Sequence, residues 1–197
     1  MEKSVLITCF DPFGGENENA SMAAVFGLPE KVGKYNIVKL CVPTVFDTAA
    51  DTVFEKAREI SPAAIICIGQ AAGRKEVTPE VIGINLIDAR IPDNAGNMPK
   101  DTPVFKGAPA AYFSTLPVTR ITEAVCQAGI PCKKSYSAGA FVCNCLLYSL
   151  LHRFDGSNTR VGFIHLPVLP QQAKENMPSM PAEDTVKALI AAINALD

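Results

Sequence analysis

The sequence predicts an α/β fold in which helices cover a mostly parallel, largely buried sheet. Short apolar runs rich in β-branched residues alternate along the chain with longer segments of helical periodicity. Strands that alternate with helices are typical of sheets with both faces covered. The chain has 197 residues and contains no repeat, linker or low-complexity tract. We therefore expect one domain over residues 1–197, built around one core.

Several segments have the composition of buried strands. Each is a short apolar run bounded by polar or turn-forming residues, which is the pattern of a strand in a covered sheet. The strong candidates are residues 4–9, 36–42, 64–69, 82–88 and 160–166, and a weaker candidate is 132–136.

Other segments show the spacing of helices that bury one face. In residues 47–60 apolar side chains recur every three or four positions, and residues 118–128 and 140–153 are also expected to be helical. A last helix is expected to begin near Pro181, because proline is favoured in the first turn. Its apolar face would carry Val186, Leu189, Ile190 and Ile193.

Two stretches rich in turn-forming residues are predicted to lie on the surface. Residues 92–109 combine Pro, Gly, Asn and Asp, and residues 167–181 carry four prolines. A loop as long as the first one in a compact domain is usually functional.

Composition excludes several classes of protein. The net charge of −2 provides no basic stripe of the kind that nucleic acid requires. No apolar run is long enough to span a bilayer, and the N-terminus lacks the layout of a signal peptide, so we expect a cytoplasmic protein without membrane contact. The seven cysteines lack CxxC spacing and there are only two histidines, so free thiols without a metal or cofactor are expected.

Cys143 is the first candidate for a nucleophile. It lies near the start of the predicted helix 140–153, where the helix dipole lowers a thiol pKa and favours the thiolate. Cys145 is about 200° further around that helix and should face elsewhere. The competing interpretation of Cys143 is core packing, the more frequent fate of a cysteine in an apolar helix.

The two histidines have different prospects as a base. His152 lies nine residues after Cys143 on the same helix, about 900° and 13.5 Å away, so it cannot serve Cys143. Its place in the last turn is explained by a role at the helix end. His165 closes the predicted strand 160–166, and α/β folds place reactive groups at the carboxyl ends of strands. It could equally be a buried, hydrogen-bonded histidine.

A cysteine–histidine pair requires a third group that fixes the imidazole tautomer. Four carboxylates in or near the strand-like segment 82–88 are candidates for this role. Spacing alone does not choose among Glu76, Glu80, Asp88 and Asp93.

Four sequence blocks together resemble one family, the pyroglutamyl peptidases. They are Thr8-Cys-Phe-Asp-Pro-Phe-Gly-Gly-Glu16 with Asn19 and Ser21; Gly69-Gln70 through Arg74, Thr78-Pro-Glu80 and Asn85 to Gly96; Ser137-Ala-Gly-Ala-Phe-Val-Cys-Asn144 leading to Tyr148; and Gly162-Phe-Ile-His-Leu-Pro167 with Pro170-Gln171. The blocks keep the family's order and cover nearly the whole chain. Cys9, Ala20 and Gly83 depart from the family pattern.

The resemblance implies a fold, a reaction and a triad. The fold would be a single-domain, three-layer α/β/α sandwich with a mostly parallel, mixed sheet like that of phosphorylases and hydrolases. The reaction would be hydrolysis of the amide bond after an N-terminal pyroglutamyl residue, through an acyl-enzyme. The triad carries over to Glu80, Cys143 and His165, which makes the protein a thiol protease. Family members commonly form dimers or tetramers, so a homo-oligomer is expected.

The resemblance also implies a substrate pocket. Phe13 and Phe141 match the aromatic positions that flank the lactam ring, and Phe10 matches a nearby apolar wall. Gln70 and Asn19 match polar positions of the pocket, with Gln70 acting through its backbone. Arg90 and backbone N–H groups near Cys143 are candidates for oxyanion support. The alternatives are core packing for the phenylalanines, turn support for Asn19, and an ion pair with Asp93 or another acid for Arg90.

Two other functions compete with the peptidase. A nucleoside phosphorylase-like activity is suggested by the family's sheet topology, but the sequence has no glycine-rich phosphate loop followed by Lys-Ser or Lys-Thr. A non-catalytic binding module built on a decayed enzyme would not need to keep Cys143, His165 and Glu80 together. The peptidase is therefore the predicted function.

Overall fold

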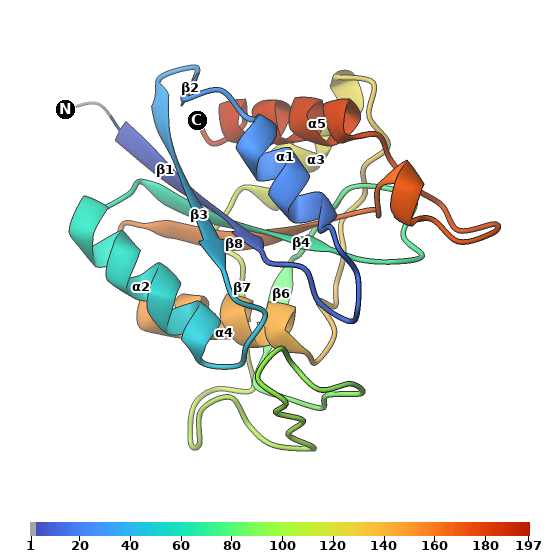
Figure 1. The fold of residues 1–197 in the computed structure, drawn as a ribbon. Helices are drawn as coiled ribbons and strands as arrows, with labels where there is room; N and C mark the ends of the chain where they lie inside the picture. Colours follow the sequence, from blue (N-terminus) through green and yellow to red (C-terminus); the bar gives the residue numbers. More distant parts are fainter. Residues whose placement is uncertain (1–2) are drawn as a thin grey trace.

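The computed structural model describes residues 3–197, and a six-stranded sheet runs through its centre (Figure 1). The strand order is β2-β3-β1-β4-β8-β5. The four inner strands are parallel, whereas β2 and β5 at the two edges are antiparallel to their neighbours. The bounds are β2 Lys31–Val32, β3 Tyr35–Val42, β1 Lys3–Phe10, β4 Ala64–Gln70, β8 Arg160–Leu166 and β5 Thr78–Pro79.

Helices cover both faces of this sheet. Figure 1 shows α1 (Ala20–Gly27), α3 (Val118–Gln127) and α5 (Ala182–Asn194) on one side, and α2 (Thr48–Ile60) and α4 (Val142–Arg153) on the other. Side chains alternate along β1, because Val5, Ile7 and Cys9 belong to one apolar cluster whereas Leu6 and Phe10 belong to the other. The predicted three-layer α/β/α sandwich with a mixed sheet is confirmed.

The parallel strands place their carboxyl ends along one edge of the sheet. β1 ends at Phe10, β4 at Gln70 and β8 at Leu166, and Gln70 lies directly opposite Leu166. Loops from these strand ends therefore meet at one edge, which is where α/β folds place ligands.

Most predicted elements are confirmed, and two strand predictions are wrong. The segment 82–88 forms only β6 (Ile82–Ile84), which pairs with β7 (Ala111–Phe113) in a separate two-stranded sheet. Beyond Ile84 the backbone N–H groups of residues 85, 87 and 88 donate to the carbonyls of Ala110, Thr102 and Ala140, so the chain leaves the sheet. The segment 132–136 makes isolated bridges beside residues 77–80 instead of a strand. The helix α1 was not predicted from the sequence.

The long excursion at residues 92–109 lies on the surface as expected, and buried Asp93 organises its start. The Asp93 carboxylate accepts hydrogen bonds from the backbone N–H groups of Phe46, Ala95 and Asn97 and from the Asn97 side chain. These bonds lower the pKa of Asp93, although burial alone would raise it. The side chain of Asn94 then donates to Asp11 and to the carbonyl of Pro12. The excursion therefore supports the loop that carries Phe13.

The remaining turn-rich stretch, residues 167–181, contains the short 3₁₀ helix Pro170–Gln172.

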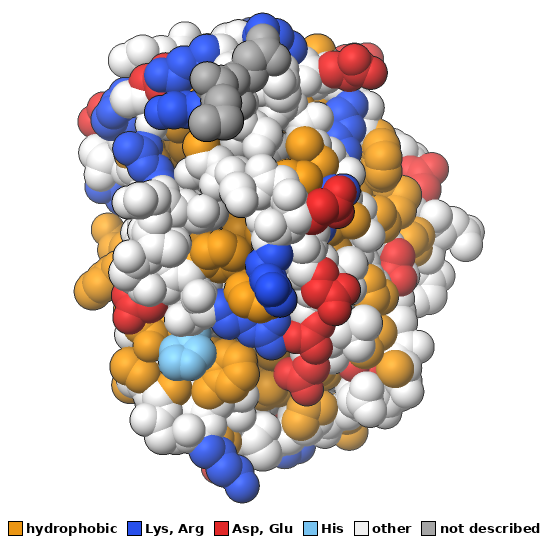
Figure 2. Space-filling view, turned by 90° about the vertical axis from the view of Figure 1, so that its left-hand side faces the viewer, with side chains coloured by type: hydrophobic (Ala, Val, Ile, Leu, Met, Phe, Trp, Pro, Cys, Tyr) orange, Lys and Arg blue, Asp and Glu red, His pale blue; other side chains and the backbone are white. Residues whose placement is uncertain are grey.

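On the face shown in Figure 2, basic and acidic side chains occur side by side with apolar ones between them. Within residues 3–197, no helix has the length and apolarity needed to cross a membrane.

Candidate active site

His165 and Glu80 form the core of the site. His165 is the sixth residue of β8, and the antiparallel pairing of β5 with β8 sets Thr78 opposite it. The backbone N–H of Glu80 donates to the carbonyl of Phe163, so the carboxylate lies beside the imidazole. His165 Nδ1 and Glu80 Oε1 are 2.7 Å apart. Both residues are buried, with 3% and 0% of their surface exposed.

The other three candidate acids contact different partners. Glu76 pairs with Lys75 and Lys133 on the surface. Asp88 is paired with Lys100 at 3.6 Å, and Asp93 caps the excursion as described above. Of the four carboxylates between which spacing could not choose, Glu80 is the one hydrogen-bonded to His165.

Burial and hydrogen bonding set the charges of this pair. Burial alone raises the pKa of Glu80, but the hydrogen bond from His165 and the nearby Arg74 charge bring that pKa below its ordinary value. Burial lowers the pKa of His165 and outweighs the attraction of Glu80, which raises it. At neutral pH Glu80 is therefore ionised and His165 is neutral. Since an ionised carboxylate only accepts hydrogen bonds, Nδ1 carries the proton and Nε2 is left as a free acceptor.

Cys143 is the second residue of α4 and is partly exposed. Burial raises the pKa of its thiol to about 12, and the negative charge of Glu80 adds to the rise. Arg74 and the backbone N–H of Cys143 act in the opposite direction but do not offset burial. The thiol pKa is therefore raised, contrary to the expectation from the helix dipole, which contributes only about 0.3–1 kcal/mol.

The segment before α4 connects Cys143 with the His165–Glu80 pair. Ser135 bridges to Glu80, and the carbonyl of Ser137 accepts a hydrogen bond from Arg74 at 3.0 Å. Gly139 turns the chain with a φ of 81°, a conformation that glycine adopts without strain. The carbonyl of Ala140 then accepts from the N–H of Asp88, two residues before the helix begins.

Cys145 and His152 face other parts of the molecule than Cys143 does, as the helical geometry predicted. Cys145 is buried in the apolar cluster between α2, α4 and the sheet. His152 occupies the last turn of α4, and its Nδ1 lies 2.9 Å from the hydroxyl of Tyr112. Its ring also packs against Phe105, with centroids 4.9 Å apart. Aromatic packing therefore adds to the helix-end role inferred for His152.

Three of the predicted pocket residues meet around the start of α1. Asn19 is buried and caps the helix, because its Oδ1 accepts from the N–H and the hydroxyl of Ser21. Its Nδ2 donates to the carbonyl of Asp11 at 3.0 Å. The side chain of Gln70 accepts from the N–H of Ala20 at 2.8 Å, and the backbone N–H of Phe10 donates to Ser21. These bonds hold the ends of β1 and β4 together.

The other predicted pocket residues lie in loops near the same edge. Phe13 is half-buried in a turn closed by the hydrogen bond from the N–H of Glu16 to its carbonyl. Phe141 precedes α4 directly and packs edge-on against Phe46, with centroids 5.3 Å apart. Arg90 is exposed, and within residues 3–197 the structure gives it no ion pair with Asp93.

Phe163 and Gly69 fix the position of the imidazole. The rings of Phe163 and His165 have centroids 4.6 Å apart, and the rings of Phe10 and Phe163 have centroids 6.3 Å apart. A Cβ added at Gly69 would lie 2.7 Å from Phe163 and 3.1 Å from His165. Only glycine leaves room for both rings beside β4.

Two residues contribute to the site although the sequence suggested no role for them. Asn144 is fully buried, and its side chain exchanges hydrogen bonds with Ile84 and donates to the carbonyl of Leu86. Arg74 contacts Glu80 directly. Both belong to the sequence blocks quoted above, but no spacing rule connects either of them to its partner.

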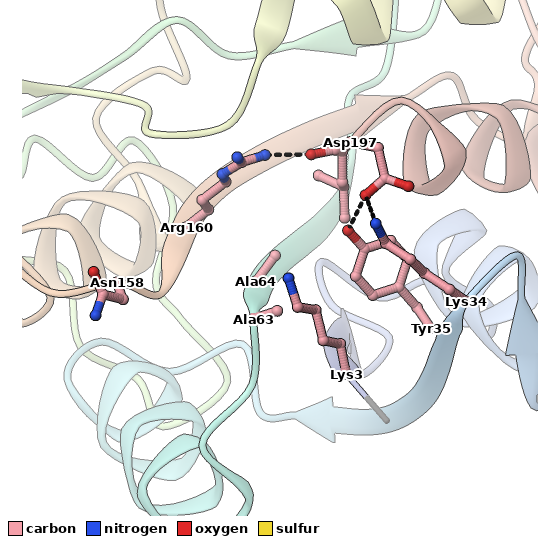
Figure 3. A pocket seen from close by; sticks show the side chains of 9 residues that line it. Lys3, Lys34, Tyr35, Ala63, Ala64, Asn158, Arg160 and Asp197 are labelled. Atoms are coloured by element: carbon pink, nitrogen blue, oxygen red, sulfur yellow. Dashed lines mark hydrogen bonds and ion pairs between the residues drawn. The ribbon is translucent and has the colours of Figure 1, made fainter. Parts of the chain in front are cut away.

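A separate cavity of about 340 Å³ lies at the amino-terminal ends of the parallel strands, opposite the strand ends that carry His165 and Gln70. Figure 3 shows Lys3, Lys34, Tyr35, Arg160 and Asp197 around it, with the Asp197 carboxylate bonded to Tyr35 and Lys34. None of its lining residues is a cysteine or a histidine, so this cavity is not the site described above. Within residues 3–197 no cluster of His, Cys, Asp and Glu has the arrangement of a metal site.

Comparison with known proteins shows close relatives along the whole chain. A family profile for pyroglutamyl peptidases matches residues 3–197. The chain is 46% identical to a pyrrolidone-carboxylate peptidase of Staphylococcus carnosus, over 98% of this chain and 92% of the relative. It is 48% identical to one from Bacillus cereus, over 91% and 85%.

Solved structures agree with these relatives. The crystal structure of pyroglutamyl peptidase I from Bacillus amyloliquefaciens superposes with a TM-score of 0.94, at 44% identity, and covers 99% of this chain and 97% of that one. A pyrrolidone carboxyl peptidase from Thermococcus litoralis gives a TM-score of 0.93 at 36% identity, covering 98% and 93%.

Proposed function

The chain belongs to the pyroglutamyl peptidase family, and on that premise we propose that Cys143, His165 and Glu80 form its catalytic triad. The enzyme is a cysteine peptidase, a hydrolase that removes an N-terminal pyroglutamyl residue from peptides. The observation that carries the triad is the 2.7 Å contact between His165 Nδ1 and Glu80 Oε1, in a buried setting near Cys143.

The proposed reaction begins from a neutral thiol and a neutral imidazole. As the sulfur of Cys143 bonds to the pyroglutamyl carbonyl carbon, the thiol proton moves to Nε2 of His165. The carbonyl electrons move onto oxygen and give a tetrahedral intermediate. Glu80 stabilises the imidazolium and holds its orientation.

The second half of the reaction regenerates the enzyme. The imidazolium of His165 gives its proton to the leaving amine as the C–N bond breaks, which leaves a thioester on Cys143. Water then attacks the thioester carbonyl, and its proton passes through Nε2 of His165 to the departing sulfur. Pyroglutamate is released, and side chains supply all of this chemistry, so no cofactor is expected.

Support for the oxyanion is proposed to come from the start of α4. The first N–H groups of a helix lack intrahelical partners, and those of Cys143 and its neighbours would lie close to a carbonyl attacked by the Cys143 thiol. Arg90 is a second proposed donor, since its guanidinium is exposed just before the excursion and free of an ion pair with Asp93 within residues 3–197.

The proposed pocket holds the lactam ring between aromatic faces. Phe13 and Phe141 are half-buried in loops and would supply these faces, with Phe10 as the apolar wall. The side chain of Gln70 is occupied by α1, so its backbone is the group proposed to bind the lactam. Asn19 is occupied in the same way and supports the pocket through the carbonyl of Asp11.

The assay that tests this function is release of a fluorophore from a pyroglutamyl amide. Release is expected from the wild-type protein and should stop after treatment with iodoacetamide, because alkylation removes the nucleophile. Protection from iodoacetamide by pyroglutamate would place the reactive thiol in the lactam pocket. Release that continues after full alkylation would contradict a cysteine mechanism.

Specificity for the lactam follows from its chemistry. Pyroglutamate has a neutral ring N–H and a carbonyl, whereas proline has a similar ring with a charged amine and no carbonyl. Binding proline would leave a pocket donor unpaired and bury a cation, so we expect prolyl and glutaminyl amides to be cleaved about 10⁴-fold less efficiently. The measurement compares kcat/KM for the three amides. Prolyl cleavage within about tenfold of the pyroglutamyl rate would contradict the pocket, by the same arithmetic.

Phe141→Ala offers a second arm for the pocket test. Its loss removes an aromatic face and should lower kcat/KM for the pyroglutamyl amide strongly. Phe26→Ala is a matched control, because that residue is 54% exposed on α1. Equal activities for the two variants would show that Phe141 is only a packing residue.

The pH dependence of the reaction follows from the lowered pKa of His165. The neutral imidazole is the base, so activity is present above this pKa and lost as the pH falls through it. Because burial holds the pKa of His165 below its ordinary value, half-maximal kcat/KM is expected below about pH 6.5. Melting temperatures at each pH control for unfolding. A half-maximal point above about pH 7 would contradict a depressed pKa.

The assembly and location of the enzyme are also proposed. We infer a cytoplasmic enzyme that acts as a single domain over residues 1–197 and assembles into a homodimer or homotetramer. All seven cysteines are free thiols, as a reducing compartment favours. The exposed rings of Phe113 and Tyr136 are apolar surface suited to burial between subunits. Light scattering during gel filtration tests the proposed oligomeric state, and a monomer at micromolar concentration would contradict a homodimer or homotetramer.

A further inference from the structure

Arg74 lies at the point where β4 ends and the chain turns toward β5. The turn is closed by the bond from its N–H to the carbonyl of Ala71, and Gly73 adopts a φ of 83° within it. The side chain is only 26% exposed. Its Nη1 donates to Glu80 Oε1 at 2.7 Å and also to the hydroxyl of Thr78, and its Nη2 donates to the carbonyl of Ser137 at 3.0 Å.

The contact of Arg74 with Glu80 places a positive charge beside a buried carboxylate. Glu80 is fully buried, and its Oε1 accepts hydrogen bonds from both Arg74 and His165. Among residues 3–197, Arg74 and His165 are the ionisable groups in ion-pair contact with Glu80. Since the imidazole is neutral at rest, Arg74 supplies the only permanent positive charge to this carboxylate. A buried carboxylate without such a partner tends to take up a proton.

The contact with Ser137 concerns position. Ser137 belongs to the segment that leads into α4, and Cys143 follows six residues later. A guanidinium is planar and holds its donors in a fixed relation, so one group sets the distance between Glu80 and this segment. An ammonium on a lysine chain would reach one acceptor at a time in a less defined geometry.

We propose that Arg74 is a positioning residue of the peptidase, which keeps Glu80 ionised and ties it to the segment that carries Cys143. The proposal rests on the triad given above. The guanidinium is already bonded to Thr78, Glu80 and Ser137, so its proposed action is through Glu80, His165 and Cys143. Its charge lowers the pKa values of all three groups, which is the direction that keeps the acid ionised and the base neutral.

The test is the pH profile of Arg74→Gln on the pyroglutamyl amide. Removal of the charge raises the pKa values of Glu80 and His165, so the acid limb of kcat/KM should move to higher pH. On the acid limb, below the pKa values of both proteins, the loss should be about 10- to 100-fold, which corresponds to one or two pKa units. Arg153→Gln is the matched control. Arg153 is 25% exposed and pairs with Asp51 at the other end of α4, so it should keep the wild-type profile.

Arg74→Lys separates charge from geometry. It should keep the acid limb at the wild-type pH while lowering the maximal rate, because one ammonium does not hold Glu80 and Ser137 together. This variant also carries the test if Arg74→Gln fails to fold, as judged by circular dichroism. An acid limb displaced in the lysine variant would overturn the proposal. So would a glutamine variant that loses rate equally at every pH, since that is the result of a purely structural role.

The two proposals fail in different ways. If the wild-type protein released no fluorophore or ignored iodoacetamide, the proposed function itself would be wrong. If the wild-type protein behaved as expected and Arg74→Gln kept both its rate and its acid limb, only the role of Arg74 would be wrong.

Discussion

Cys143→Ser is expected to lower turnover of a pyroglutamyl amide by about 10⁴-fold or more while the protein remains folded. The thiol is the only nucleophile proposed at the start of α4, and a serine hydroxyl is a far weaker one in this setting. The substitution changes one atom at a partly exposed position, so the melting temperature should stay close to that of the wild type. The measurement is kcat from the fluorophore assay, together with a thermal melt.

The other cysteines provide matched controls for this experiment. Cys126 is exposed at the end of α3, and Cys145 lies on the same helix as Cys143 but in the core. Cys126→Ser should be fully active, whereas Cys145→Ser should be active but less stable. Turnover by Cys143→Ser near the wild-type rate, or loss of activity in all three variants, would show that Cys143 is not the nucleophile.

The raised pKa of Cys143 makes its histidine partner indispensable. A thiol whose pKa lies at about 12 is protonated at any physiological pH, so the helix dipole does not supply a standing thiolate. The proton must leave during the attack itself, and the free Nε2 of His165 is the proposed acceptor. A thiol that is neutral at rest needs such a base at the moment of attack.

Local sequence patterns predicted the parallel core of the fold and missed its edges. The inner strands are long apolar runs, and burial on both faces makes such runs easy to recognise. β2 and β5 span two residues each, and α1 is short with apolar side chains around most of its surface. Segments of this kind have no clear period, because tertiary hydrogen bonds such as those of Asn19 and Gln70 decide their structure.

Local sequence patterns also left the candidate site incompletely predicted. His165 could be placed at a strand end from the sequence, but the choice of Glu80 over Glu76 could not be made by spacing. The antiparallel pairing of Thr78 with His165 favours Glu80, because it brings together Glu80 and His165, which are 85 positions apart. The contact of Arg74 with Glu80 depends on the turn after β4 in the same way. Family resemblance suggested the triad, and the contact between His165 and Glu80 that supports the proposal appears only in the folded chain.

His165→Ala is expected to abolish turnover to a similar extent as Cys143→Ser, whereas His152→Ala should leave the rate within a few-fold of the wild type. His165 is the proposed base and its Nδ1 is hydrogen-bonded to Glu80, so its loss removes the proton acceptor and leaves a buried carboxylate beside an empty space. His152 is packed among Phe105, Tyr112 and Tyr148, away from Cys143. Its truncation should instead lower stability, by about 1–3 kcal/mol.

Both variants should be measured for kcat and for melting temperature, because His165→Ala is expected to lose turnover and His152→Ala to lose stability. A stability loss of this size corresponds to a fall of roughly 2–12 °C in the melting temperature of a chain of this length. His165→Gln is a useful third variant, since its amide can contact Glu80 without acting as a base, and it should be folded but inactive. The proposed base for Cys143 is His165 and not His152. Equal losses of turnover in His165→Ala and His152→Ala would therefore contradict the assignment.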